Sequence, residues 1–533
     1  MPADAGAIGD GGAFRLRPTV RRLFAADALL PDGWARDVML EWNDAGMLTR
    51  VETGIDVSRI DALTDTADTG VPVGFETAAG PVLPGMPNLH SHAFQRAFAG
   101  LTEYRAGGAD DFWSWRASMY RFAAAITPEQ LEAVAIYVYL EMLEAGYTSV
   151  CEFHYLHHDV DGRPYPARGM DDATMAMCVM RAAEEVGIGL TLLPVLYQTS
   201  GFGGRPALPE QRRFIRSTDA MIGLLAGLKP MCDPRRIRLG LAPHSLRAVP
   251  PDSLRQALAG LHSIDASAPI HVHVAEQTAE VDDCLAHHGS RPLQWLLDHA
   301  DVDRRWCLVH ATHLVAGELA RAARSGAVAG LCPTTEANLG DGLFDIVGWR
   351  EAGGAWGIGS DSHVCVDPAE DLMLLEYGQR LTRRRRNVLA GRVGTSGGVG
   401  GGGSSPMPAG AGADGGVDAG PALDEHDGRA DVATSLWLSA VAGGAQAAAR
   451  PIAGLSVGQQ ADFVVLDAAH PLVAGLSAPD MLSAHLFASH RRSAIAEVWT
   501  AGRPRVTASR HDLHEPVAAA FVAARAALAG AGR

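Results

Sequence analysis

The chain has few basic residues for its length, few cysteines and no long apolar run. Its 533 residues include 45 lysines and arginines against 61 aspartates and glutamates, giving a formal net charge of −16. An acidic protein gains no electrostatic attraction to nucleic acid or an anionic membrane, so neither is expected as a partner. No apolar stretch approaches the roughly 20 residues that span a bilayer. Residues 1–15 lack the basic and apolar segments of a signal peptide, so none is expected.

The seven cysteines are scattered, odd in number and without a CxxC pair. This usage argues against a disulfide framework and predicts reduced thiols, mostly packed as small apolar residues, in a cytoplasmic protein.

Apolar residues, by contrast, make up 47% of the chain, and eight runs after residue 80 are predicted as strands. Most are continuously apolar, as in strands covered on both faces. Helical patterns separate them, which predicts parallel βαβ units and an α/β fold, a (β/α)8 TIM barrel with its active site at the carboxyl ends of the strands. The predicted strands are Gly80–Leu89, Thr148–Phe153, Gly189–Leu196, Ile237–Ala242, Pro269–Val274, Trp306–Val309, Ala327–Leu331 and Ala355–Gly359; the predicted helices include Pro128–Ala145, Met170–Val186, Pro209–Leu225, Pro250–Leu261 and Val315–Ser325.

Both flanks differ from the barrel region. Residues 1–79 and 451–533 contain short strand-like runs between turns, and we expect them to form one small flanking β-sandwich domain split around the barrel of residues 80–392, followed by a helix at Pro516–Ala529. Residues 393–431 have the glycine-rich composition of a flexible linker and are predicted to be a disordered insertion. Residues 432–450 are predicted to be the last barrel helix. The basic run Arg383–Arg386 fits a solvated helix end better than a nucleic-acid contact.

The motif with the clearest chemistry is His90-Ser91-His92, at the end of the first predicted strand. Residues i and i+2 of an extended backbone point to the same side, so both imidazoles can reach one metal ion. The fifth strand ends similarly in His271-Val272-His273, with Glu276 three residues on. We favour His273 as the ligand because it lies nearer the strand's carboxyl end, and we expect His271 to pack beneath it.

The sixth and eighth strands supply further donors. His310 ends the sixth strand and is preferred over His313 in the following loop; Asp361 follows the eighth strand, where it could bind metal or merely cap a helix. Three neutral imidazoles and one carboxylate suit Zn2+ and leave a position for water. Such an ion lowers the pKa of bound water to about 7, which indicates hydrolytic chemistry.

Four segments are similar to those of one family: Pro84–Arg96, Cys151–His158, Ala242–Arg247 and His273–Gln277. They resemble the formimidoylglutamate deiminases (N-formimino-L-glutamate iminohydrolases) of histidine degradation, in the mononuclear-zinc branch of the amidohydrolase superfamily. HxH and HxxE are common to the superfamily, whereas HAFQR, FHYLHH and HSLR belong to the narrower family. The resemblance covers nearly the whole chain except the glycine-rich insertion. It implies a metal-dependent barrel with a flanking β-sandwich, one Zn2+ per subunit, a homodimer, and hydrolysis of N-formimino-L-glutamate to N-formyl-L-glutamate and ammonia.

The resemblance also implies individual roles. His90, His92, His273 and Asp361 match the zinc ligands, Asp361 also accepts a proton, Glu276 matches the proton shuttle and His310 matches a residue that stabilises the reacting centre. Gln95 matches a contact to the formimino group, and the glutamate moiety is held by Arg116, Tyr155, His244 and Arg247. Two guanidinium groups do suit a dicarboxylate. On the residues alone, Arg116 could equally lie on a surface helix and Arg247 in a loop ion pair.

A second metal cluster and two other functions remain as alternatives. His154, His157 and His158 look like a further metal cluster, but packing around the pocket is the favoured interpretation. Another zinc deaminase of this superfamily, acting on guanine, a pterin or a triazine, would need aromatic stacking and no carboxylate-binding arginines. A non-catalytic metal-binding barrel would have a closed site, and the presence of Glu276 and His310 beside the metal favours catalysis over it.

Overall fold

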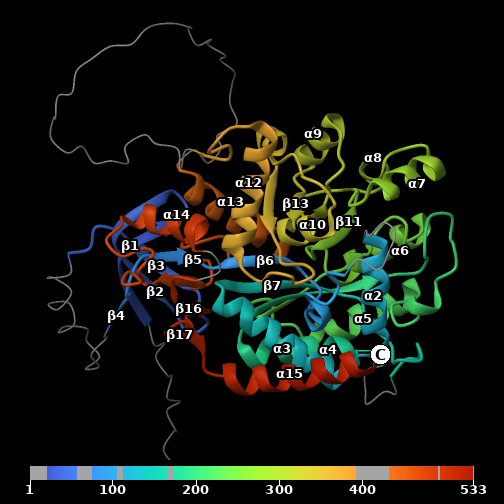
Figure 1. Ribbon diagram of the computed structural model, residues 1–533, viewed down its shortest axis with the longest axis horizontal. Coiled ribbons are helices and arrows are strands. Elements are labelled where there is room, and N and C mark those ends of the chain that lie inside the picture. Colours follow the sequence, from blue (N-terminus) through green and yellow to red (C-terminus); the bar gives the residue numbers. More distant parts are fainter. Residues whose placement is uncertain are drawn as a thin grey trace, which may run out of the picture.

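The computed structural model describes residues 21–56, 75–104, 112–165, 173–391, 431–489 and 493–531. They form a barrel of parallel strands beside a mainly antiparallel sheet (Figure 1). Residues 1–15, for which no signal peptide is expected, lie outside the described residues. The predicted insertion at 393–431 also lies outside them, apart from Asp431. Asp431 forms a bridge with Gly391, so the two ends of that insertion lie side by side. Within the described ranges, no helix is long and apolar enough to cross a membrane.

The barrel is built from eight strand positions in chain order. They are β6 (Met86–Ser91), β7 (Tyr147–His154), β8 (Gly189–Leu196), β9 with β10 (Ile237–Leu239 and Ala242–Pro243), β11 (Ile270–Val274), β12 (Trp306–His310), β13 (Val328–Leu331) and β14 (Ala355–Ile358). Neighbouring strands pair in parallel. A bridge between Leu241 and Ile270 joins the two halves, and a bridge between Ser91 and Asp361 closes the barrel. The predicted (β/α)8 fold is confirmed.

Helices surround the barrel, and their ends follow local sequence signals. At the start of α3, Thr127 and Gln130 form a capping box; Gly187, with φ 78°, ends α4 in the left-handed region. The helices are α2 (Phe112–Ala125), α3 (Pro128–Glu144), α4 (Thr174–Val186), α5 (Thr218–Leu228), α6 (Pro251–Ile264), α7 (Thr278–His288), α8 (Pro292–His299), α9 (Ala316–Ser325), α10 (Pro333–Leu339), α11 (Ile346–Glu351), α12 (Pro368–Arg383), α13 (Val432–Ala448), α14 (Ala478–Ala488) and α15 (His514–Ala531), with short 3-10 turns η1 (Ala93–Phe98), η2 (Pro209–Gln211) and η3 (Lys229–Met231).

The helix predicted at Pro209–Leu225 is wrong in its first half. Only the turn η2 forms there, and α5 begins at Thr218, where the Ser217 hydroxyl accepts the Ala220 N–H as an N-cap. Between them, buried Arg213 donates hydrogen bonds to the carbonyls of His158 and Ile126 at 2.9 and 2.8 Å. Tertiary hydrogen bonding therefore holds this segment in an irregular path.

The first predicted strand, Gly80–Leu89, is in fact two strands in different sheets. β5 (Val82–Pro84) pairs with β1 and β15 of the flanking sheet, and β6 begins the barrel after Gly85. A Cβ atom at Gly85 would lie 2.3 Å from the Thr148 side chain. The glycine thus permits the close crossing from one sheet to the other.

The flanking sheet combines strands from both ends of the described chain, which Figure 1 shows in blue and red beside the barrel. Its nine strands follow the order β18-β17-β16-β15-β5-β1-β2-β3, with β4 on β1. Their bounds are Arg21–Leu30 (β1), Gly33–Trp42 (β2), Leu48–Glu52 (β3), Glu76–Thr77 (β4), Phe463–Leu466 (β15), Ile495–Thr500 (β16), Arg503–Thr507 (β17) and Arg510–His511 (β18).

The central strands of this sheet are buried on both faces, as alternation along β15 shows. Phe463 packs edge-on against Trp42, with ring centroids 5.8 Å apart, in a core on the outer face. Val464 and Leu466 belong instead to the large core shared with the barrel. The prediction of a small β domain built from both termini is confirmed, and this sheet forms the wall between its core and that of the barrel.

Candidate active site

Donor side chains from the ends of three barrel strands, β6, β11 and β14, converge at the carboxyl end of the barrel. The Nε2 atoms of His90 and His273 lie 2.9 Å apart. The Asp361 carboxylate lies 3.6 Å from His90 Nε2 and 3.4 Å from His92 Nε2. Carboxyl ends of the strands meet at one face of a (β/α)8 barrel, which is why residues so distant in the chain come together.

The backbone fixes two of these donors directly. The Asp361 N–H donates to the His90 carbonyl at 3.0 Å, and the His92 N–H donates to the Asp361 carbonyl at 3.1 Å. Ala275, His310 and Asp361 adopt φ values of 50°, 65° and 48°, in the left-handed region that residues other than glycine rarely occupy. Such backbone costs about 1–3 kcal/mol per residue and is concentrated at functional sites. Here it turns the ends of β11, β12 and the β14 segment toward the common centre.

The three histidine donors have the protonation state that a divalent cation requires. Burial lowers the pKa of His90 and His273 well below the usual range, and that of His92 to about 3. These imidazoles are therefore neutral and can offer lone pairs. The His92 Nδ1 lies 2.9 Å from the Phe153 carbonyl oxygen, so it carries the proton and leaves Nε2 for the centre. Three neutral imidazoles with one carboxylate fit a zinc-type ion.

A buried carboxylate supports the HxH segment from behind. Glu152 accepts hydrogen bonds from the Ser91 hydroxyl at 2.6 Å, the Ala93 N–H at 2.8 Å and the Tyr139 hydroxyl at 3.1 Å. Below the centre, His271 pairs through Nε2 with the Ala447 carbonyl at 2.9 Å, at the end of α13. His271 thus packs beneath the site and ties the barrel strand to this helix.

Two further groups lie beside the donor set. His310 Nε2 is 3.8 Å from carboxylate oxygens of both Glu276 and Asp361. Its other nitrogen, Nδ1, is 3.2 Å from Glu336, which also accepts the Cys332 N–H at 2.9 Å. Burial by itself would lower the pKa of His310, but these carboxylates raise it to about 10. His310 is therefore a hydrogen-bond donor aimed between two acids.

These groups open into one cavity. Every residue expected in the site lines it except His90, which is completely buried beneath. The expected members are His92, Gln95, Arg116, Tyr155, His244, Arg247, His273, Glu276, His310 and Asp361, and Phe112, Trp115, Met119, Thr335 and Leu339 complete the wall. The sequence reasoning therefore selected residues that share one cavity.

The arginines lie on one side of the cavity. Arg116 donates to the Tyr197 hydroxyl at 2.8 Å and packs over the Tyr120 ring. Arg247 packs over Trp113, and its Nε has no hydrogen-bond partner among the described residues. Neither arginine forms a salt bridge among the described residues, so this wall is suited to a carboxylate ligand.

Gln95 and Tyr155 form a hydrogen-bonded pair in the lining of the cavity. The Gln95 amide donates to the Tyr155 hydroxyl at 2.8 Å, while its Oε1 has no partner in the described part of the chain. That oxygen is an acceptor available for an N–H group of a ligand. Arg116 does not lie on the surface, since it is only 8% exposed. Arg247 does lie in the loop between β10 and α6, but it is equally buried and forms no ion pair among the described residues.

The remaining histidines are placed by backbone contacts. His157 and His158 each pair with a carbonyl, that of Val195 at 2.9 Å and that of Ile215 at 2.8 Å. They do not form a metal-binding group among the described residues. His313 lies in the loop after β12, outside the cavity lining.

Sequence reasoning missed Glu336, Tyr197 and Glu152. Glu152 lies near the carboxyl end of β7, Tyr197 directly follows β8, and Glu336 lies in α10, the helix that follows β13. That position was the available signal, but it is shared by many residues without a function.

Comparison with known proteins adds family information. Residues 82–407 match the model of the Amidohydrolase family, and residues 20–63 match that of the formimidoylglutamate deiminase HutF N-terminal domain. A formimidoylglutamate deiminase of Pseudomonas aeruginosa is 46% identical over 500 residues, covering 94% of this chain and 98% of that protein. An 8-oxoguanine deaminase of the same species is 26% identical over 328 residues, 60% of this chain and 67% of that protein.

Solved structures agree on the architecture. An amidohydrolase from Brucella melitensis has a TM-score of 0.79 at 42% identity, covering 96% of this chain and 100% of that chain. An adenosine deaminase from Xanthomonas campestris, solved with bound zinc, has a TM-score of 0.70 at 19% identity over 96% of this chain and 98% of that one. At that identity the likeness concerns the fold alone.

Proposed function

Because the chain belongs to the amidohydrolase family, and within it to the formimidoylglutamate deiminases, we propose that this hydrolase converts N-formimino-L-glutamate and water to N-formyl-L-glutamate and ammonia in histidine degradation. The substrate assignment rests on two buried guanidinium groups, those of Arg116 and Arg247, which line the same cavity as the donor set. A substrate with two carboxylates at one end and an amidine at the other matches this polarity. A purine or triazine would leave both arginines without anionic partners.

His90, His92, His273 and Asp361 would hold the cation, and the neutral imidazoles favour Zn2+. When bound, such an ion lowers the pKa of water and stabilises negative charge at the reacting carbon.

The chain's own residues divide the proton transfers. Asp361 accepts a proton from the attacking water, whose oxygen adds to the formimino carbon. Glu276 protonates the terminal nitrogen and then accepts the remaining hydroxyl proton as the bond from that nitrogen to the carbon breaks, so the formyl carbonyl forms and ammonia leaves. His310, held by Glu336 at Nδ1, donates a hydrogen bond from Nε2 toward the developing charge. General acid–base catalysis of this kind contributes about 10²–10⁴-fold.

At the other end, Arg116, Arg247 and His244 hold the glutamate moiety, with Tyr155 beside them. Tyr155 also orients Gln95, whose free Oε1 accepts an N–H of the formimino group. Remote binding of the carboxylates thus positions the amidine carbon for attack.

The direct test is ammonia release by the purified full chain loaded with Zn2+. We expect turnover of N-formimino-L-glutamate, with equimolar N-formyl-L-glutamate, and little from N-formimino-glycine or guanine. A higher kcat/KM for guanine would contradict the substrate assignment. Asp361→Asn is expected to abolish turnover while far-ultraviolet circular dichroism stays unchanged, and full activity of that variant would remove Asp361 from the mechanism.

We also propose that the enzyme works in the cytoplasm as a homodimer, without nucleic-acid or membrane partners. Its excess of acidic residues supports the last two points. Light scattering during size-exclusion chromatography, at several protein concentrations, tests the oligomeric state. A monomer throughout would refute the dimer.

A further inference from the structure

A basic recess lies at the opposite end of the barrel from the active site. Gly189 and Ile237, the first residues of β8 and β9, line it together with residues of the flanking sheet. The arginines along it are Arg235, Arg236, Arg450, Arg503 and Arg505. Glu184 and Asp462 are the acidic residues of its lining, and Asp233 beside it forms a salt bridge with Arg235, so five positive charges face three negative ones. In a chain of net charge −16 this local excess is unusual.

Arg450 is the most telling member. It is only 7% exposed. Its Nη2 donates to the Arg235 carbonyl at 2.7 Å and to Gln460 Oε1 at 2.8 Å, both from residues of the recess. Its Nε and Nη1 have no hydrogen-bond partner within the described ranges. A buried cation with unused donors is costly, and an anion at this point would satisfy both the charge and the donors.

Two glycines give the arginines room along the backbone. A Cβ at Gly189 would lie 1.7 Å from Arg450 Nη1, and a Cβ at Gly187 would lie 2.2 Å from Arg505 Cζ. Any larger residue would displace these guanidinium groups. The glycines therefore make room for Arg450 and Arg505. Among the described residues, neither arginine donates a hydrogen bond to a carboxylate.

The rim of the recess carries the same sign of charge. Arg503 and Arg505 of β17 both line the recess. The Arg505 Nε donates to the Thr500 hydroxyl at 3.0 Å, which leaves its remaining N–H groups for other partners. Burial, together with Arg503 and Arg236, lowers the pKa of Arg505. The guanidinium groups thus repel one another across the opening, and an anion between them would relieve the repulsion.

We propose that this basic recess binds a small oxyanion of the phosphate class, with Arg450 at its base and Arg503 and Arg505 at its rim. Planar guanidinium groups offer paired N–H donors that match tetrahedral oxyanions. Because the recess joins the amino ends of β8 and β9 to β16 and β17, the bound anion stabilises the junction of barrel and flanking sheet. It takes no part in the chemistry at the other end of the barrel.

The test is calorimetric titration of the zinc-loaded protein with inorganic phosphate, at constant ionic strength maintained with sodium chloride. Arg116 and Arg247 could themselves bind phosphate, so the titration is repeated with Arg247→Gln. We expect one saturable site that persists in this variant, and a melting temperature that rises with phosphate concentration. Absence of saturable binding, or its complete loss in Arg247→Gln, would overturn the proposal.

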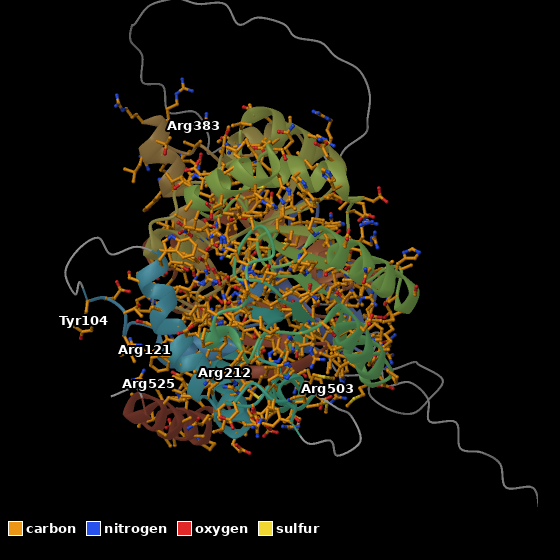
Figure 2. All side chains as sticks on the ribbon, turned by 90° about the vertical axis from the view of Figure 1, so that its right-hand side faces the viewer. Tyr104, Arg121, Arg212, Arg383, Arg503 and Arg525 are labelled. Carbon is orange, nitrogen blue, oxygen red and sulfur yellow. The ribbon has the colours of Figure 1, made fainter. Side chains whose placement is uncertain are left out.

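Substitutions in the recess locate the site. Arg505→Gln and Arg450→Gln are each expected to raise the Kd for phosphate about tenfold or more, with kcat and KM for the amidine substrate unchanged. Arg525→Gln is the matched control, since Arg525 lies on α15, apart from Arg503 in Figure 2. If Arg450→Gln fails to fold, Arg505→Gln decides alone. A wild-type Kd in Arg505→Gln would show that phosphate binds elsewhere and would refute the assignment.

Discussion

Replacing Arg247 by glutamine separates substrate binding from stability. Arg247 is 8% exposed in the cavity wall, and its Nε has no hydrogen-bond partner among the described residues. Its guanidinium carbon lies 5.8 Å from the Trp113 ring centroid. Arg116, by comparison, already donates one hydrogen bond to Tyr197. Arg247 is therefore the arginine with more donors available to a substrate carboxylate.

The expected magnitude follows from the contact that would be lost. A hydrogen bond to a charged group contributes about 1.5–3 kcal/mol, so kcat/KM should fall about 10- to 150-fold. Most of the fall should appear in KM, because the carboxylate is held equally before and during the reaction. The melting temperature should stay the same or rise, since the substitution removes a buried cation that forms no salt bridge among the described residues.

Steady-state ammonia release across a range of N-formimino-L-glutamate concentrations measures the kinetic effect, and differential scanning fluorimetry measures the melting temperature. Arg121→Gln is the control, because Arg121 lies on α2 near the cavity but is exposed. It should behave like the wild type. A fall in kcat at unchanged KM, or a clear loss of stability in Arg247→Gln, would refute a carboxylate-binding role.

Three other predictions follow from the same structure. Glu336→Gln should lower kcat about 10- to 100-fold with little change in KM or metal content, because it loosens His310 without touching the donor set; an equal rise in KM would argue against positioning. Burial alone would raise the pKa of Asp265, but hydrogen bonds from Lys229, Ser267 and Arg238 hold it well below its usual value. Asp265→Asn should therefore lose about 1 kcal/mol at pH 7, allowing for solvent screening. The difference from wild type should begin to shrink as the pH falls through about 4 and should disappear only below the depressed pKa of the folded state; urea unfolding over this pH range measures it, and a constant difference would contradict the linkage. Removal of metal by a chelator should abolish ammonia release and lower the melting temperature, with both restored by Zn2+; activity that survives verified metal depletion would exclude metal-dependent catalysis.

The sequence predicted the barrel and its donors well because both depend on simple periodicities. Continuously apolar runs between helical patterns indicated the parallel strands, and the i, i+2 spacing of His90 and His92 placed both on one side of a strand. Strand ends of a barrel gather at one face whatever the detailed packing. Candidates at those ends, such as His273 and Asp361, could therefore be grouped before any distance was known.

The rest depended on contacts between distant segments. The left-handed backbone at His310 and Asp361 has no signal in the residue types. Glu336 became visible only through its 3.2 Å approach to His310. Gly85 ends one sheet and begins another because of the Thr148 side chain beside it, and Arg213 interrupts a helical pattern through carbonyls of other loops. Local sequence cannot report such partners.

The bridge between Ser91 and Asp361 has a consequence for how the molecule assembles. His90 and His92 stand on one side of that seam and Asp361 on the other, so the donor set is complete only when the chain has wound round every strand. A fragment ending before β14 would keep all three histidines yet lack the carboxylate and the hydrogen bonds that align them. Metal affinity should therefore report whether the barrel has closed. The ion would bind late in folding and stabilise the closed barrel relative to partly folded, open intermediates.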